Sequence, residues 1–188
     1  MQALHGALST VSMSADLFRI ESGTYQLKPE PVPVLGLIQE VISTHRPFWA
    51  EKQLSNRVQA ADAQQPQSKA PMVMGESALC RVVLQNLLKN AWEASPAQGE
   101  VLLSWQILKE RWVLRITNAG AIPPDIRGSF FDKFVTAGKT QGTGLGTYSA
   151  QLLTRAQHGT LEFEVDDARQ MTTLVWSLPL AGHCVLPD

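Results

Sequence analysis

The chain has 188 residues, 44% of them hydrophobic and 18% charged, and its formal net charge is -1 at pH 7. This length and apolar content predict one ordinary folded domain and exclude a disordered polymer. The near-neutral charge argues against nucleic acid as a partner, because nucleic-acid binders need clustered Lys and Arg to displace counterions.

The two cysteines, Cys80 and Cys184, are too far apart in sequence for a disulfide framework or a zinc site. No uncharged apolar run approaches the roughly 18 residues of a membrane span. The N-terminus also lacks the basic and apolar regions of a signal peptide. We therefore expect a reducing, cytoplasmic location, with any membrane anchor in sequence outside this chain.

The first predicted element is a helix over residues 1–22. Its apolar side chains recur at helical spacing, at Leu4, Leu8, Val11, Ala15 and Phe18. Gly23 ends the pattern. Because no capping residue precedes the first turn, we expect the chain to begin inside a longer helix; a complete N-terminal helix is the alternative.

Next comes an extended segment at 25–32, which contains two prolines. A helical pattern of apolar residues follows from Val34 to Trp49, and Pro47 is expected to mark the end of that helix. Further strands are predicted at 54–60, 72–74, 101–107, 112–117, 161–165 and 172–178, and further helices at 77–94 and 147–157. Strands in adjacent pairs with helices between them predict an α+β fold. We expect a two-layer α/β sandwich, whose mixed, mostly antiparallel sheet carries helices on one face.

Two asparagines on the helix at 77–94 raise the possibility of a metal site. Asn86 and Asn90 are four residues apart and share one face, and Glu93 follows three residues later on the same side. A carboxamide oxygen is a hard, neutral ligand that suits Mg²⁺ shared with nucleotide phosphates. The alternative, which this helix alone favours, is a pair of solvated polar residues.

Three glycines, Gly142, Gly144 and Gly146, stand just before the helix at 147–157. Glycine lets the backbone approach phosphate oxygens, and free N–H groups at a helix start bind anions. The pattern is no dinucleotide fingerprint, because Thr147 replaces its last glycine and a loop precedes it. It is no P-loop either, because Lys133 takes the place of that motif's first glycine. A flexible turn is the alternative interpretation.

In chain order the motifs are NLLKNAWEAS, a hairpin, TNAGAIPP, FFDKF and GTGLG followed by a helix. This order closely resembles the ATP-binding catalytic domain of sensor histidine kinases, within the superfamily that includes gyrase, mismatch-repair and heat-shock-chaperone ATPases. The resemblance implies the end of a second dimerisation helix at 1–23, the ATP-binding domain at 24–180 and a tail at 181–188. It implies a catalytic fragment that transfers the γ-phosphoryl group of ATP to a histidine on a dimerisation domain absent from this chain.

The ligands implied by the resemblance are ATP and Mg²⁺. The partners are the protein's own dimerisation and phosphoacceptor domain, a response regulator and, in the full-length homodimer, a second copy. The residues implied to bind ATP are Asn86, Asn90, Glu93, Asn118, Gly120, Ile122, Phe131, Phe134, Lys139, Gly142, Thr143, Gly144, Leu145 and Gly146. No catalytic residue is assigned.

Some of these residues have a more specific implied role. Asn90 would contact Mg²⁺ directly, and Asn86 would support the ion or a phosphate through water. The three glycines would form the phosphate side of a flexible lid, above an aromatic box that contains Phe131 and Phe134. Lys139 would reach a phosphate as a point charge; the alternative is a solvated loop lysine.

The adenine motif departs from the family pattern Asp-x-Gly-x-Gly. Aligned without a gap, it has Thr117 in place of the aspartate; shifted by one residue, it has Asn118 followed by Gly120. We favour Asn118, because its carbonyl oxygen accepts a hydrogen bond from the adenine amino group without a charge. Hydrogen bonds to charged groups are roughly twice as strong, so weaker nucleotide binding is expected. A second departure is Glu93, where many relatives carry a basic residue.

No histidine has the sequence context of the family's phosphoacceptor: His5 lacks the acidic residue and the proline that follow it, and His45, His158 and His183 lie in other elements. Hydrolysing relatives carry a water-activating glutamate at the position of Asn86, which is no base, so phosphoryl transfer is favoured over hydrolysis. Two alternatives stay open, namely a degenerate domain that signals by protein contact and an anti-sigma-type serine kinase.

Overall fold

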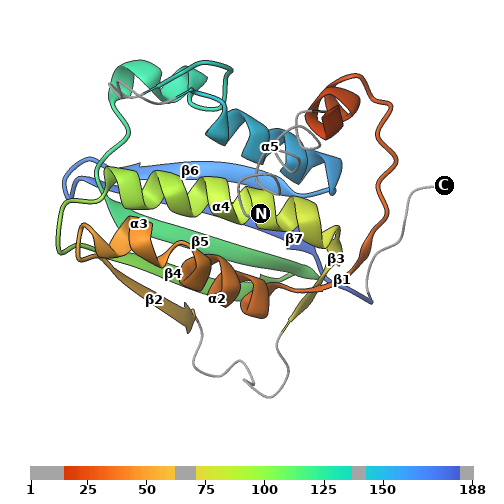
Figure 1. Cartoon of the computed structure of the whole chain (residues 1–188), viewed down its shortest axis with the longest axis horizontal. Helices are drawn as coiled ribbons and strands as arrows, with labels where there is room; N and C mark the ends of the chain where they lie inside the picture. Colours follow the sequence, from red (N-terminus) through yellow and green to blue (C-terminus); the bar gives the residue numbers. More distant parts are fainter. Residues whose placement is uncertain (1–14, 62–70, 137–142, 183–188) are drawn as a thin grey trace, which may run out of the picture.

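The computed structural model describes residues 15–61, 71–136 and 143–182 (Figure 1). Five strands form the main sheet in the order β2-β4-β5-β7-β6. Their bounds are β2 Ser55–Ala60, β4 Glu100–Leu108, β5 Arg111–Ala119, β6 Thr160–Asp166 and β7 Met171–Pro179. The strands β2 and β4 run parallel and the other neighbours antiparallel, which confirms the predicted mixed sheet.

Helices cover one face of this sheet (Figure 1). They are α2 Val34–Thr44, α3 Arg46–Ala50, α4 Ser77–Ala94 and α5 Gly146–Ala156. A small second sheet pairs β1 Glu30–Pro33 with β3 Met72–Gly75, and a short 3-10 helix, η1, spans Pro124–Ser129. The predicted two-layer α+β architecture is therefore confirmed. In the described part of the chain, no helix has the length and apolar character needed to cross a membrane.

The sheet buries one face because its residues alternate. In β5, Trp112, Leu114 and Ile116 are buried, and the residues between them are partly exposed. The Trp112 ring meets the Trp176 ring of β7 edge to face, with centroids 5.5 Å apart. Each fully buried apolar side chain of this size stabilises the fold by about 1.5–3 kcal/mol.

The central helix α4 has the predicted bounds, and its two ends are held by polar contacts. At its C-terminus, Lys52 Nζ donates to the carbonyl oxygens of Trp92, Glu93 and Ser95 at 3.1, 2.8 and 3.1 Å. At its N-terminus, the carboxylate of Glu76 accepts the Tyr25 hydroxyl at 2.6 Å. A cation at the C-terminus and an anion at the N-terminus both interact favourably with the helix dipole and so stabilise α4.

One predicted helix differs from the structure. The helix expected from Val34 to Trp49 is broken at His45, because Pro47 is tolerated in the first turn of α3 but not inside a continuous helix. The extended segment at 25–32 leads into β1, which pairs with β3.

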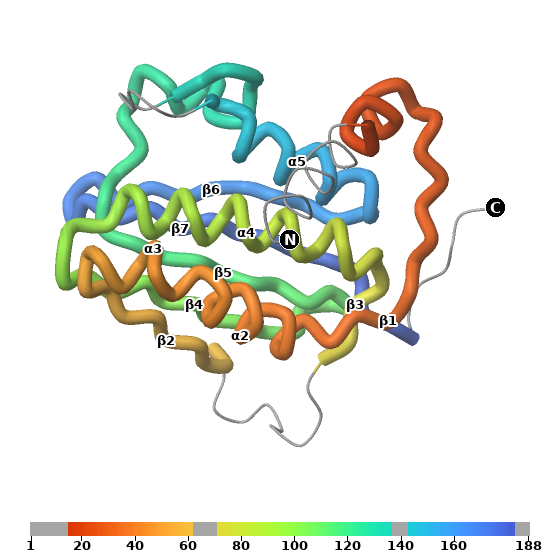
Figure 2. Tube along the Cα trace, viewed as in Figure 1, coloured from red at the N-terminus to blue at the C-terminus, as the bar shows by residue number. Residues whose placement is uncertain are grey.

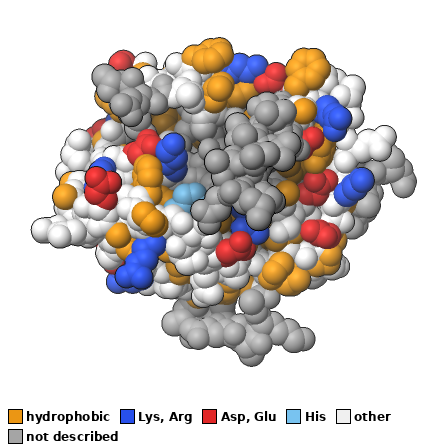
Figure 3. All heavy atoms as spheres, viewed as in Figure 1, with side chains coloured by type: hydrophobic (Ala, Val, Ile, Leu, Met, Phe, Trp, Pro, Cys, Tyr) orange, Lys and Arg blue, Asp and Glu red, His pale blue; other side chains and the backbone are white. Residues whose placement is uncertain are grey.

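The path from the helical turn at 15–21 to β1 is visible in Figure 2. On the face in Figure 3, acidic and basic side chains are interspersed.

Candidate functional site

Two carboxamides of α4 face the beginning of α5. A methyl group placed on Gly146 would lie 3.5 Å from Asn86 Oδ1 and 3.9 Å from Asn90 Nδ2. Both asparagine side chains are half-buried, and neither makes a hydrogen bond to another described residue. The structure therefore brings together the asparagine pair and the last of the three glycines, with polar atoms left available for a ligand.

The first turn of α5 adds backbone donors at the same place. The first N–H to find an acceptor inside the helix is that of Ser149, which donates to Leu145 O at 2.8 Å. The N–H groups of the preceding turn have no intrahelical acceptor, and the helix dipole is positive there. Together with the glycine backbone, this is the arrangement that receives anionic phosphate oxygens.

The two ends of the glycine-containing loop meet at Phe134 and Gly144. The Phe134 N–H donates to Gly144 O at 3.0 Å, and Gly144 has a φ of +66°. A Cβ at Gly144 would clash with the Phe134 carbonyl carbon, so only glycine fits. We call this pair of residues the loop base. Thr143 and Leu145 on either side of Gly144 are exposed, and the predicted site residues Lys139 and Gly142 lie outside the described residues.

The aromatic residues of FFDKF do not behave alike. Phe131 packs with Phe130 and Phe163 at centroid distances of 5.1 to 5.9 Å, in an aromatic cluster over β6. The Phe134 side chain is 73% exposed. Its backbone is left-handed, with a φ of +67°, and the chain turns there into the loop base. The structure therefore places Phe131, but not Phe134, in this aromatic cluster.

Asn118 and Thr117, the two residues considered for the adenine position, face opposite sides of β5. Asn118 is 2% exposed on the helix-covered face of β5, whereas Thr117 faces the other side, where its hydroxyl meets that of Thr173 at 2.9 Å. Asn118 Nδ2 donates to Ala119 O at 2.8 Å. No described residue donates to Asn118 Oδ1, so this oxygen has the acceptor capacity that an amino group requires.

The chain then turns closely past the end of α4. Gly120 has a φ of +111°, and a Cβ there would lie 2.8 Å from Ala94 O. The buried hydroxyl of Thr172 donates to Gly120 O at 2.8 Å and accepts the N–H of Ile122, which is also buried, at 3.2 Å. Sequence reasoning missed Thr172, because only the β5–β7 register shows that it lies opposite Asn118.

Acidic side chains do not supply a metal site here. Glu93 on the last turn of α4 pairs with Lys89 at 3.8 Å. Within the described ranges, no group of three His, Cys, Asp or Glu side chains lies close enough together to hold a metal ion. An ion between Asn86 and Asn90 would therefore depend on carboxamide, phosphate and water oxygens, a ligand set that fits Mg²⁺.

The matching family model decides the family. It is the model of histidine kinase-, DNA gyrase B-, and HSP90-like ATPases, and it matches residues 75–182. The chain belongs to this ATPase family. The match runs from the start of α4 to the end of the last strand, so it includes Asn86, Asn90, Asn118 and the glycines of the loop.

Curated relatives are histidine kinases. The circadian input-output histidine kinase CikA of Synechococcus elongatus is 25% identical over 186 residues, which cover 94% of this chain and 24% of CikA. The sensory histidine kinase/phosphatase NtrB of Azospirillum brasilense is 31% identical over 126 residues, covering 58% of this chain and 31% of NtrB. The chain thus spans no more than a third of either relative's length.

A solved structure shows the same fold. Full-length ShkA in complex with AMPPNP is similar with a TM-score of 0.75 at 24% identity, over 94% of this chain and 36% of ShkA. Sequence and fold together identify an ATP-binding catalytic domain of the histidine kinase type, as used in two-component signalling.

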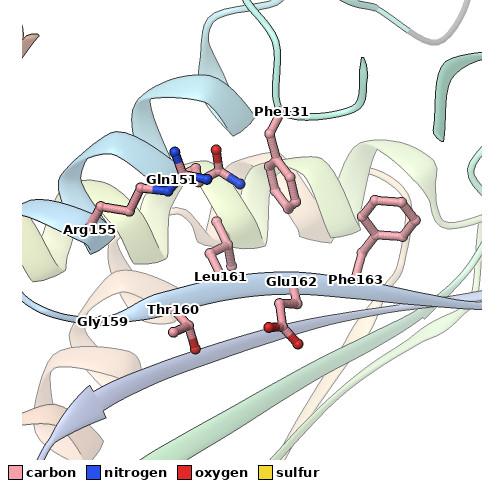
Figure 4. A pocket seen from close by; sticks show the side chains of 8 residues that line it. All are labelled: Phe131, Gln151, Arg155, Gly159, Thr160, Leu161, Glu162 and Phe163. Atoms are coloured by element: carbon pink, nitrogen blue, oxygen red, sulfur yellow. The ribbon is translucent and has the colours of Figure 1, made fainter. Parts of the chain in front are cut away.

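A cavity of about 620 Å³ lies on the other side of α5 from the asparagines' helix, between α5 and β6 (Figure 4). Gln151 and Arg155 of α5 and Leu161 of β6 line it, with Phe131 above. Of the predicted site residues that the structure describes, only Phe131 contributes to this cavity. The predicted site residues on α4, on α5 and at the end of β5 do not line this cavity.

Proposed function

We propose that this chain is the catalytic part of a sensor histidine kinase, which binds Mg-ATP and transfers the γ-phosphoryl group to a histidine on a dimerisation domain. The observation that carries the proposal is the convergence of Asn86, Asn90 and Gly146 at the positive end of α5. The AMPPNP complex of the similar ShkA supports nucleotide as the ligand.

Each region of the site has a distinct part in this function. The N–H groups of the first turn of α5 and the backbone of Gly144 and Gly146 would hold phosphate oxygens. Asn90 would bind Mg²⁺ and Asn86 would support it through water. Bound Mg²⁺ neutralises charge on the phosphates. Asn118 Oδ1 would accept a hydrogen bond from the adenine amino group, beside the turn at Gly120, where the chain passes close to Ala94 O.

The chemistry of this site is positioning rather than acid–base catalysis. Asn86 cannot remove a proton from water, so the site favours transfer to a nucleophile over hydrolysis. Phosphoryl transfer needs in-line alignment and charge stabilisation, both of which fixed backbone donors supply. The only described cysteine, Cys80, offers no alternative nucleophile, because burial raises the pKa of its thiol to about 12.

The proposed function includes the partners of a two-component system. The phosphoacceptor histidine would belong to the protein's own dimerisation domain, and a response regulator would take the phosphoryl group from it. The full-length protein would be a homodimer with this domain in the cytoplasm. The histidine kinase names of the curated relatives support these proposals.

Calorimetric titration with AMPPNP tests the nucleotide site. We expect binding that requires Mg²⁺ and that Asn90→Ala abolishes. The matched control is Gln85→Ala, which removes another half-buried carboxamide from the same helix. Undiminished binding by the Asn90 variant would contradict the assignment of the metal position.

A degenerate domain that acts by protein contact is the second candidate. It is favoured by Asn118, which replaces a charged acceptor with a neutral one and uses its own Nδ2 in an internal hydrogen bond. No detectable binding at millimolar ATP would support this candidate. An anti-sigma-type serine kinase is distinguished by the product, because phosphohistidine is acid-labile and phosphoserine is not.

A further inference from the structure

The carboxylate of Glu21 contacts both sides of the loop base. Its Oε1 lies 2.7 Å from Lys133 Nζ and accepts the Tyr148 hydroxyl at 2.7 Å. Lys133 immediately precedes Phe134, and Tyr148 lies in the first turn of α5, shortly after Gly144. One oxygen atom from a distant part of the chain therefore connects the residues on the two sides of the loop base.

A third contact closes this cluster. Lys133 Nζ lies 4.9 Å from the centroid of the Tyr148 ring, within the range of a cation–π interaction. The hydrogen bonds from Lys133 and Tyr148 lower the pKa of Glu21, and the hydrogen bond to Glu21 raises the pKa of Lys133. Both shifts favour the charged forms, so the pair is ionised over the ordinary pH range.

Glu21 is the last residue of the helical turn at 15–21, and that turn packs against the rest of the domain. Leu17 and Ile20 are partly buried against the hydrophobic core. Phe18, on another side of the turn, is 70% exposed. A shift of this turn relative to the domain would move Glu21, because the carboxylate is attached at its very end.

The loop base is positioned to respond to such a shift. Phe134 and Gly144 are joined by one backbone hydrogen bond, and there is no spare volume between them. Beyond Gly144, the chain enters α5 at Gly146, which faces Asn86 and Asn90. A change in the distance between Lys133 and Tyr148 would therefore move the backbone that leads to Gly146, next to Asn86 and Asn90.

We propose that Glu21 couples the helical turn at 15–21 to the nucleotide site by holding Lys133 and Tyr148 together across the loop base. Withdrawal of Glu21 loosens the loop base and weakens Mg-ATP binding. This consequence for binding rests on the proposed function. Glu21, Lys133 and Tyr148 are positioning residues, because they act through the loop base.

The first test measures backbone amide hydrogen exchange without nucleotide, on the whole chain. In Glu21→Ala we expect exchange at the Phe134 N–H and at the Ser149 N–H, which donate to Gly144 O and Leu145 O, to be faster by about two- to fivefold, the range for a partly exposed ion pair. The matched control is Asp16→Ala, whose carboxylate lies on the same helical turn and pairs with Arg19 at 3.5 Å. Equal exchange in the two variants would overturn the proposal.

A charge exchange provides the rescue. Glu21→Lys combined with Lys133→Glu restores an ion pair of opposite polarity and should recover much of the protection that either single change loses. If Glu21→Ala fails to fold, Lys133→Met removes the same contact from the other side and is read in the same way. Failure of the exchanged pair to recover any protection would show that the charge contact does not hold the loop base.

AMPPNP titration of the same variants separates the two proposals. Weaker binding by Glu21→Ala, by about two- to fivefold, with Asp16→Ala unchanged, supports the coupling. Binding that Glu21→Ala leaves unaltered overturns the coupling and leaves the nucleotide site standing. If the unaltered chain binds no nucleotide, the proposed function fails, and the hydrogen-exchange result alone decides whether Glu21 holds the loop base.

Discussion

Thr172 on β7 lies directly opposite Asn118 on β5, and its hydroxyl holds the segment by which the chain leaves β5. That hydroxyl pairs with both Gly120 O and the Ile122 N–H. Since Asn118 is the proposed acceptor for adenine, Thr172 supports the backbone that turns away from it. Thr172 on β7 is therefore a structural residue that positions the backbone beside Asn118, the proposed binding residue on β5.

Replacement of Thr172 by Val should destabilise the fold by about 1–3 kcal/mol, because the partly buried carbonyl of Gly120 and the buried N–H of Ile122 lose their partner. Urea unfolding measures this loss. Thr173→Val is the control: its hydroxyl meets Thr117 on the partly exposed face, where water replaces the lost partner. A Thr172 variant as stable as the Thr173 variant would contradict the bridging role.

Replacement of Asn118 by Asp should tighten AMPPNP binding by about fivefold, since a charged acceptor forms the stronger hydrogen bond. The free domain should lose stability, because the carboxylate would be buried next to Ala119 O. Titration and unfolding of the same variant measure both effects. Unchanged affinity together with reduced stability would place the adenine amino group elsewhere.

Replacement of Gly144 by Ala should open the loop base. The φ of +66° and the clash that a Cβ would make with the Phe134 carbonyl carbon make alanine costly there, by about 1–3 kcal/mol. We expect weaker AMPPNP binding by calorimetry. Gly128→Ala on η1 is the matched control, because a Cβ at that position meets nothing within 4 Å. Equal affinities of the two variants would argue against a role for the loop base in binding.

The ion pair between Arg127 and Asp167 should contribute to acid sensitivity. Arg127 Nη1 donates to Asp167 Oδ2 at 3.0 Å, and this holds the pKa of Asp167 below its ordinary value. A carboxyl group with a lowered pKa in the folded state stabilises the fold above its unfolded pKa of about 3.9. That contribution disappears as the pH falls through the folded pKa.

Asp167→Asn should therefore flatten the acid limb of the stability curve, between about pH 5 and pH 2. Urea midpoints at several pH values test this, with Asp125→Asn, an exposed carboxylate on η1, as the control. Parallel curves for the unaltered chain and the Asp167 variant would show that the pair makes no such contribution.

Periodic patterns were enough to predict most of the elements. The helix predicted at about 77–94 corresponds to α4, because Leu79, Val83 and Leu87 repeat at the spacing of a helix that packs on one side. The strands predicted at 101–107 and 112–117 form the hairpin of β4 and β5, and in the structure their residues alternate in burial. The order of the motifs then led to the ATPase family, which the family match confirms.

The tertiary structure decided which side chains meet. The choice between Thr117 and Asn118 depends on which face of β5 is covered, and a shift of one residue in a strand exchanges the two faces. The roles of Thr172 and Glu21 could not be predicted from the sequence, because they depend on contacts with residues far away in the chain. Local periodicity records how one element repeats, whereas the partners of a buried hydroxyl or a surface carboxylate depend on how separate elements pack together.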